Sequence, residues 1–156
     1  MNGFVLREWT RSRKAARLLR LAGCLFPVLL LACAAGAQTV ASLPLQRGFY
    51  VSQKTACGSA SNATLMLVTR EGMNSARVIG KFRKIDRKGP TTYLVSEVHQ
   101  GLDGSALGPA ETVTYEIPNQ TTFKVTNSYG SAEYRYCAQN TLPSPWRNND
   151  IRDIVR

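Results

Sequence analysis

The single histidine of the chain, His99, and two nearby serines are the first residues whose types could perform chemistry. A histidine beside a serine can act as the general base of a hydrolase, with Ser96 or Ser105 as the nucleophile. Side chains of a strand alternate between its two faces, so Ser96 and His99, three residues apart, leave opposite faces. No serine lies in a strand–turn–helix pattern of the kind that exposes a hydrolase nucleophile. The spacing therefore predicts that His99 is a solvated residue at the end of a strand.

Paired carboxylates are the second candidate chemistry, because glycosidases place two of them on either side of the scissile bond. Glutamates occur on several predicted strands, and two of them, Glu116 and Glu133, fall on the polar faces of theirs. Neither they nor Glu97 and Glu111 show a sequence environment that would raise a pKa, which the acid of such a pair requires. The cysteines form no CxxC motif and no cysteine–histidine cluster of metal-binding spacing. The sequence predicts a protein that is not an enzyme and that has no metal or cofactor.

The first 37 residues have the pattern of a signal peptide. They carry half of the net charge of +10, and the uncharged stretch 21–35 that follows the basic residues is shorter than a membrane span of about 20 residues. Ala35-Gly36-Ala37 offers the small residues that a signal peptidase recognises. The pattern predicts cleavage before Gln38 and a protein that is periplasmic or secreted, with no transmembrane span in the mature chain.

A second interpretation of the leader is a lipoprotein signal. Leu30-Leu31-Ala32-Cys33 resembles a bacterial lipobox, in which the cysteine is acylated and becomes the first residue. In that case the signal ends before Cys33 and the protein is anchored to a membrane. A third, an uncleaved leader that serves as the anchor, also stays open. All three place the domain outside the cytoplasm.

Cysteine usage agrees with export. Cys24 and Cys33 belong to the leader, which leaves Cys57 and Cys137 as an even pair. In an exported chain such a pair predicts a disulfide. This bridge would join the start of the domain to its last strand.

The folded part shows the two-residue periodicity of strands. In 111–117, Val113, Tyr115 and Ile117 share one face, and 122–126 alternates again after a turn. Further strands are predicted at 48–52, 64–69, 77–85, 91–99 and 132–137, and turns at 71–74 and 86–90. These elements predict one small all-β domain over 38–142, an antiparallel barrel or sandwich of about seven strands with one disulfide. Residues 143–156 are predicted as a tail that contains at most a short helix.

A basic strand and turn form the only concentrated positive charge after the leader. In an exported protein this predicts a surface for a polyanion such as lipopolysaccharide, an acidic glycan or extracellular DNA, and not for cytosolic nucleic acid. Lysine and arginine also protect strand edges from pairing with other chains, so this structural role stays open. The candidate polyanion-binding residues are Arg77, Lys81, Arg83, Lys84, Arg87 and Lys88.

Two loops are the candidate recognition elements, because loops on a rigid β scaffold commonly carry binding function. They are 53–61, which contains Cys57, and the Gly/Pro-bearing loop 101–110. Trp146 is either an exposed contact or a cap on the barrel. We expect a non-enzymatic β-domain that binds a protein or a cell-envelope component through these loops, with polyanion binding as the alternative.

The general layout resembles that of small periplasmic β-barrel proteins that bind other proteins, such as the bacterial inhibitors of C-type lysozyme. The shared features are the leader, the lipobox-like Cys33, a small all-β domain and one disulfide. The resemblance implies a protein partner, and no functional residue is carried over from it.

Overall fold

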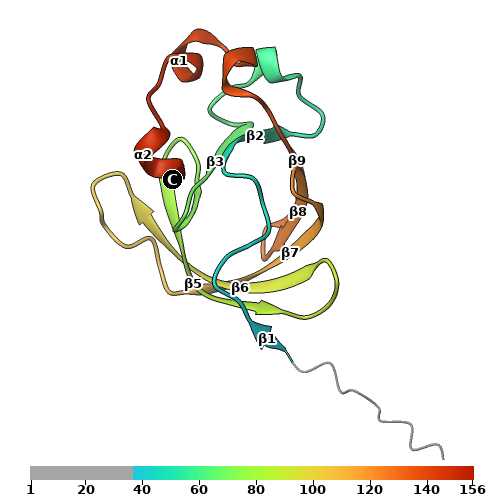
Figure 1. Ribbon diagram of the computed structural model, residues 1–156. Coiled ribbons are helices and arrows are strands. Elements are labelled where there is room, and N and C mark those ends of the chain that lie inside the picture. Colours follow the sequence, from blue (N-terminus) through green and yellow to red (C-terminus); the bar gives the residue numbers. More distant parts are fainter. Residues whose placement is uncertain (1–36) are drawn as a thin grey trace, which may run out of the picture. The chain divides into compact units, whose positions relative to one another are not determined.

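The computed structural model describes residues 37–156, and β-strands dominate this part of the chain (Figure 1). The strands are β1 (Gln38–Thr39), β2 (Gly48–Ser52), β3 (Leu65–Val68), β4 (Gly72–Asn74), β5 (Val78–Arg87), β6 (Thr92–Gly101), β7 (Glu111–Asn119), β8 (Thr122–Asn127) and β9 (Gly130–Tyr136). The helical segments are η1 (Cys57–Ser59), η2 (Gln139–Thr141), α1 (Ser144–Arg147) and α2 (Arg152–Val155). No helix in this part of the chain is long and apolar enough to cross a membrane. The predicted leader, with Cys33, lies outside the described residues except for Ala37.

The strands close into an eight-stranded antiparallel barrel. Each strand from β2 to β9 pairs with the next one along the chain, and β9 pairs back with β2. The short β1 adds to the end of β5, with Gln38 opposite Arg87. The prediction of an all-β antiparallel domain is confirmed, and the barrel is the correct one of the two predicted architectures.

The predicted turn at 71–74 is wrong, because residues 72–74 form β4. Met73 of this strand is buried in the barrel interior. Gly72 is required there, since a Cβ atom at this position would lie 1.9 Å from the carbonyl oxygen of Gly80 on β5. Glycine and asparagine thus served a close strand pairing here and not a turn.

The barrel interior contains the face that the sequence periodicity predicts. Val113, Tyr115 and Ile117 of β7 are all buried in one cluster, together with Phe123 of β8 and Val95 of β6. Burial of each large apolar side chain contributes about 1.5–3 kcal/mol to the stability of the fold. The interior is therefore packed along most of its length.

One end of the barrel is closed by the segment 40–47, which crosses from β1 to β2 (Figure 1). The amide of Val40 donates to Ile85 on one side, and the amide of Gln46 donates to Gln120 on the other. Leu43 of this segment packs into the interior. The Tyr50 hydroxyl lies 2.8 Å from the carbonyl oxygens of both Gln46 and Gln120, so this end is tied together by hydrogen bonds.

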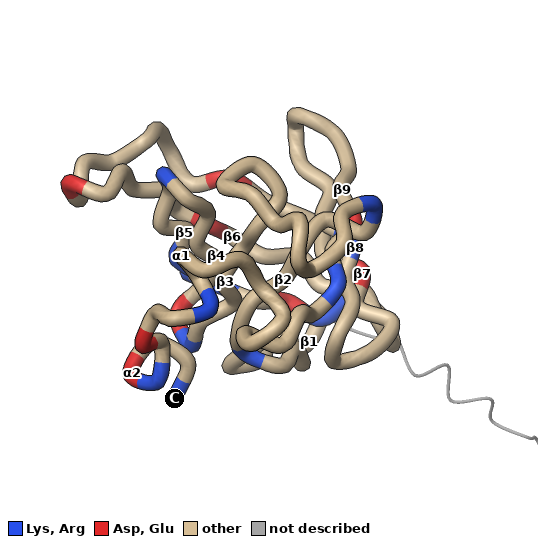
Figure 2. The backbone as a smooth tube through the Cα atoms, turned by 90° about the horizontal axis from the view of Figure 1, so that it is seen from above, with Lys and Arg blue, Asp and Glu red and all other residues tan. Residues whose placement is uncertain are grey.

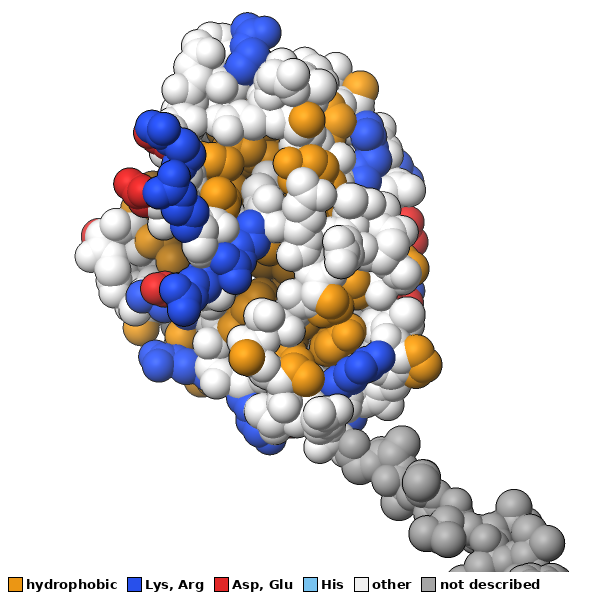
Figure 3. All heavy atoms as spheres, in the orientation of Figure 1, with side chains coloured by type: hydrophobic (Ala, Val, Ile, Leu, Met, Phe, Trp, Pro, Cys, Tyr) orange, Lys and Arg blue, Asp and Glu red, His pale blue; other side chains and the backbone are white. Residues whose placement is uncertain are grey.

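The outer surface of β2 is covered as well. Phe49 and Val51 point outward into a second apolar cluster, which loop 53–61 and the segment after β9 cover. Trp146 packs against this cluster, so it covers the outer wall and does not cap the barrel. Figure 3 shows hydrophobic side chains in a hollow beside the C-terminal segment, with Lys and Arg along its rim.

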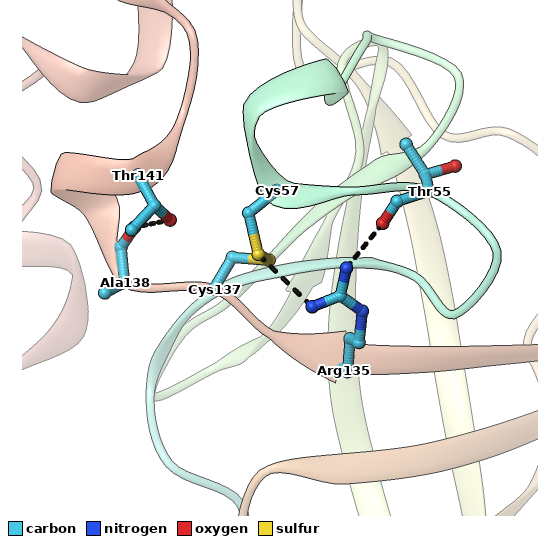
Figure 4. Close-up of a disulfide and its surroundings, with 6 residues drawn as sticks. All are labelled: Thr55, Cys57, Arg135, Cys137, Ala138 and Thr141. Atoms are coloured by element: carbon cyan, nitrogen blue, oxygen red, sulfur yellow. Dashed lines mark hydrogen bonds between the residues drawn. A yellow bond between two sulfur atoms is a disulfide. The ribbon is translucent and has the colours of Figure 1, made fainter.

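The predicted disulfide between Cys57 and Cys137 is confirmed and joins this loop to the end of β9 (Figure 4). The Arg135 guanidinium lies beside it, 3.4 Å from Cys57 Sγ, and donates to the carbonyl oxygen of Thr55 at 2.8 Å. Loop 53–61 is therefore held against the barrel wall by a covalent bond and a charged side chain.

Candidate functional site

The end of the barrel opposite segment 40–47 is open and contains a cavity of about 290 Å³. Four connections surround this end: 53–64, 75–77, 102–110 and the turn 128–129. Figure 2 shows the loop that follows β6 and the hairpin beside β9 projecting from the same end. The cavity is lined by Met66, Glu97, His99, Val113, Tyr115, Val125, Asn127, Tyr129, Gly130, Ser131, Ala132 and Tyr134.

Glu97 is the central polar residue of this cavity. It is 4% exposed and is the one charged residue among the buried positions of the described chain. Its carboxylate accepts a 2.5 Å hydrogen bond from the Tyr115 hydroxyl on Oε1, and His99 Nε2 lies 3.3 Å from Oε2. Strand alternation explains the arrangement, because Glu97 and His99 are two residues apart and share the inner face of β6.

His99 is therefore not the solvated strand-end residue that the sequence predicted. Its side chain is half-buried and points into the barrel, where it contacts Glu97. The opposite residue on β5 is Gly80, which leaves the interior beside the imidazole free of a side chain. The odd spacing from Ser96 does hold: Ser96 lies between the inward-facing Val95 and Glu97 and faces outward.

Burial raises the pKa values of three side chains that line the cavity. Desolvation raises the pKa of Glu97, while the Tyr115 hydrogen bond and the nearby His99 lower it in part. Burial, reinforced by the adjacent Glu97 carboxylate, raises the pKa of Tyr115 well above its ordinary value. Burial also raises the pKa of Tyr134. The expectation that no glutamate has a raised pKa is thus wrong for Glu97.

A second carboxylate, that of Glu111, lies next to Glu97 on the neighbouring strand. Glu111 of β7 is directly opposite Glu97 in the strand register, and its charge contributes to the raised pKa of Glu97. Its Oε1 accepts a hydrogen bond from the Ser128 hydroxyl at 2.8 Å. The inner face of β6 and β7 therefore carries two acidic groups side by side, while no Lys or Arg of the described chain lines the cavity.

The rim of the open end carries exposed apolar side chains. Three large hydrophobic side chains there are exposed: Leu102 (69%), Leu107 (49%) and Tyr129 (90%). Loop 102–110 is anchored beside the cavity, because the amide of Leu107 donates to the carbonyl oxygen of His99. Of the two loops predicted to bind a partner, 101–110 lies at this rim, whereas 53–61 folds back over the outer wall.

The predicted basic residues lie along β5 and gather in part at a second hollow. A groove of about 460 Å³ contains Lys81, Arg83 and Lys84, and the turn between β3 and β4 adds Arg70. The groove exists because β4 starts at Gly72, opposite Lys81, and β1 ends at Thr39, opposite Asp86. The part of β5 between these two positions has no strand of the described chain on that side.

The remaining predicted basic residues are not in the groove. Arg77 belongs to the turn between β4 and β5, at the opposite end of β5 from Arg87 and Lys88. The Arg87 guanidinium donates to the carbonyl oxygens of Gly89 and Pro90 and stabilises the next turn. Within the groove, Lys84 pairs with Asp86 at 2.8 Å, and this contact lowers the pKa of Asp86. The six residues therefore do not form one continuous patch.

The arrangement at the open end can hold a proton or a positively charged group on Glu97. Of the two serines considered with His99, Ser96 faces outward and the Ser105 hydroxyl donates to Asp103 at 2.7 Å, whereas the His99 imidazole contacts Glu97. Strand alternation alone predicts that Glu97 and His99, two residues apart, share one face, so this pair could have been found from the sequence. Comparison with known proteins finds no matching family model, no matching curated protein and no matching solved structure.

Proposed function

We propose that this chain is an exported, non-enzymatic binding domain that engages a protein through the open end of its barrel. The observation that carries the proposal is the clustering of exposed apolar side chains. Of the large hydrophobic residues that are exposed in residues 37–156, Leu102, Leu107 and Tyr129 surround this end, and Ile154 lies elsewhere. Exposed apolar groups gathered at one site are typical of an interface, and tyrosine is enriched in such sites.

The contact surface differs from the predicted one in one of its two loops. Loop 101–110 belongs to both the predicted and the proposed contact surface. The turn 128–129 takes the place of loop 53–61 in the proposed surface, because the disulfide holds loop 53–61 against the outer wall. Support for export comes from the leader pattern and from the disulfide, which persists in oxidising compartments.

A capture experiment with matched variants tests this proposal. Purified protein is immobilised, exposed to envelope and extracellular protein extract, and washed at about 0.5 M salt, where charge-driven contacts are screened. We expect a discrete protein to be retained by the wild type and by Ile154→Ser. A variant that carries Leu102→Ser, Leu107→Ser and Tyr129→Ser should lose it. Equal retention by this triple variant would exclude the open end as the interface.

A second function is supported by the basic groove. Arg70, Lys81, Arg83 and Lys84 surround a hollow of about 460 Å³, and this arrangement is suited to the phosphate or carboxylate groups of an envelope polyanion. Binding to purified lipopolysaccharide should fall steeply with salt. Arg70→Gln with Arg83→Gln should weaken it more than the control pair Arg77→Gln with Arg87→Gln. If both pairs weaken it equally, the groove is not the site.

A further inference from the structure

We propose that the cavity at the open end binds the positively charged end of an amphipathic group, an ammonium or guanidinium on an apolar stem, with Glu97 as its counter-ion. The group would come either from a basic side chain of the protein partner or from a free organic amine. The inference rests on the proposed function for the first of these sources only.

The charge of the cavity is the first argument. Glu97 is buried at its base, Glu111 stands directly opposite in the register, and the groups facing Glu97 from the packed strands are His99, Tyr115 and Tyr134. Like charges directly opposite one another in a sheet are destabilising, and a buried carboxylate requires a partner. His99 is the one basic side chain that lines the cavity, and it faces Glu97 at 3.3 Å. Two carboxylates therefore share one basic group among the described residues, and an external cation would supply the second positive charge.

The free acceptor capacity of Glu97 is the second argument. Its Oε1 is engaged by the short hydrogen bond from Tyr115. Its Oε2 has only the 3.3 Å contact with His99, which is long for a hydrogen bond to nitrogen. A carboxylate oxygen can accept two hydrogen bonds, so Oε2 is the atom that would accept an N–H from the ligand.

The walls and size of the cavity are the third argument. Met66, Val113 and Val125 give it apolar sides, and the aromatic side chains of Tyr115 and Tyr134 line it as well. A volume of about 290 Å³ is at the lower limit of ligand pockets. It fits one side chain or one small amine and is too small for a lipid or a nucleotide cofactor.

Binding of small probes tests the inference without the partner. Benzylamine and benzyl alcohol, which differ in charge, are titrated into the purified protein at neutral pH, and the NMR signals of His99 are followed. We expect benzylamine to bind at least about tenfold more tightly than the alcohol, as a charged hydrogen bond implies. Equal affinity of the two probes would overturn the proposal even if no variant folds.

Two glutamate variants identify the counter-ion. Glu97→Gln should weaken benzylamine binding about tenfold or more. Glu116→Gln, which removes an exposed carboxylate from the outer face of β7, should leave it unchanged. Equal binding to the wild type and to Glu97→Gln would exclude Glu97 as the counter-ion and overturn the proposal.

The source of the ligand is tested with a lysine probe. N-acetyl-lysine methylamide presents its ammonium as a protein does. Glu97-dependent binding of this probe identifies a partner side chain, whereas binding of benzylamine alone identifies a free amine; binding of neither overturns the inference. The triple loop variant should still bind amine, so loss of protein capture with amine binding intact would count against the proposed function alone.

Discussion

The two ends of the barrel differ in the hydrogen-bond partners of their buried tyrosine hydroxyls. At the closed end the Tyr50 hydroxyl is fully buried and lies within hydrogen-bond distance of two neutral backbone carbonyls, while Leu43 fills the space beneath segment 40–47. At the open end the Tyr115 hydroxyl donates to Glu97, a group that can ionise, beside a cavity that no segment of the described chain fills.

The two buried groups differ in what they contribute to stability. A buried hydroxyl with neutral partners contributes to stability at any pH, because nothing in its surroundings titrates near neutral pH. A buried carboxylate costs free energy whenever it is ionised, and burial has raised its pKa accordingly. Residues that reduce stability without an evident structural gain are characteristic of binding and catalytic sites. The comparison therefore indicates a role in stability for the closed end and agrees with the binding role proposed for the open end.

Removal of the disulfide should have the largest effect, and it should act on the covered outer wall around β2. Cys57 and Cys137 are 80 residues apart, so the chain-entropy model gives a loss of about 4–5 kcal/mol in the free energy of unfolding. Urea denaturation of a variant with Cys57→Ser and Cys137→Ser measures this loss. The cavity signals of His99 should stay native below the new midpoint. A loss below about 1 kcal/mol would show that the covered wall around β2 is stable without its covalent bond.

Substitution of the closed-end tyrosine should have an intermediate effect. Tyr50→Phe leaves the carbonyl oxygens of Gln46 and Gln120 without this donor and should lower the free energy of unfolding by about 1–3 kcal/mol. The control is Tyr134→Phe at the open end, because burial without a hydrogen bond accounts for the raised pKa of the Tyr134 hydroxyl. Its effect should stay within about 0.5 kcal/mol. Equal losses in both variants would remove the distinction between the two ends.

The parts of the fold that local pattern determines could be predicted from the sequence. Alternation assigned Tyr115 and Phe123 to the interior, and the count of cysteines outside the leader gave the correct disulfide. β4 was missed because Gly72 and Asn74 have turn-forming types, and only the close approach of β5 shows why glycine is needed.

The site required closure of the barrel. Parity places Glu97 and His99 on one face, but their burial depends on which end segment 40–47 closes. Arg70, in the turn between β3 and β4, lines the basic groove although it is more than ten residues away in sequence from Lys81 and Arg83. Such convergence depends on the register of distant strands, which no local pattern in a single sequence determines.

Substitution of Glu97 should have the smallest effect, and it should raise the free energy of unfolding where the two preceding changes lower it. It gives the sharpest test of the comparison between the two ends. Because burial raises the pKa of Glu97 in the folded state, protonation of Glu97 stabilises the fold at acid pH, below the ordinary glutamate pKa of about 4.3. That stabilisation is lost as the pH rises through the raised pKa, and the ionised carboxylate then costs stability. Glu97→Gln removes this cost and should stabilise the protein by about 1 kcal/mol at pH 7–8.

The gain should disappear at about pH 4, where wild-type Glu97 is protonated. Thermal midpoints of the wild type and of Glu97→Gln, measured across this pH range, test both statements. A variant that is less stable than the wild type at pH 7–8 would show that the ionised carboxylate stabilises the fold. Glu97 would then have a structural role like that of Tyr50, and the contrast between the two ends would fail. A variant that is more stable, and yet binds benzylamine more weakly, would show that the carboxylate lowers stability and serves binding.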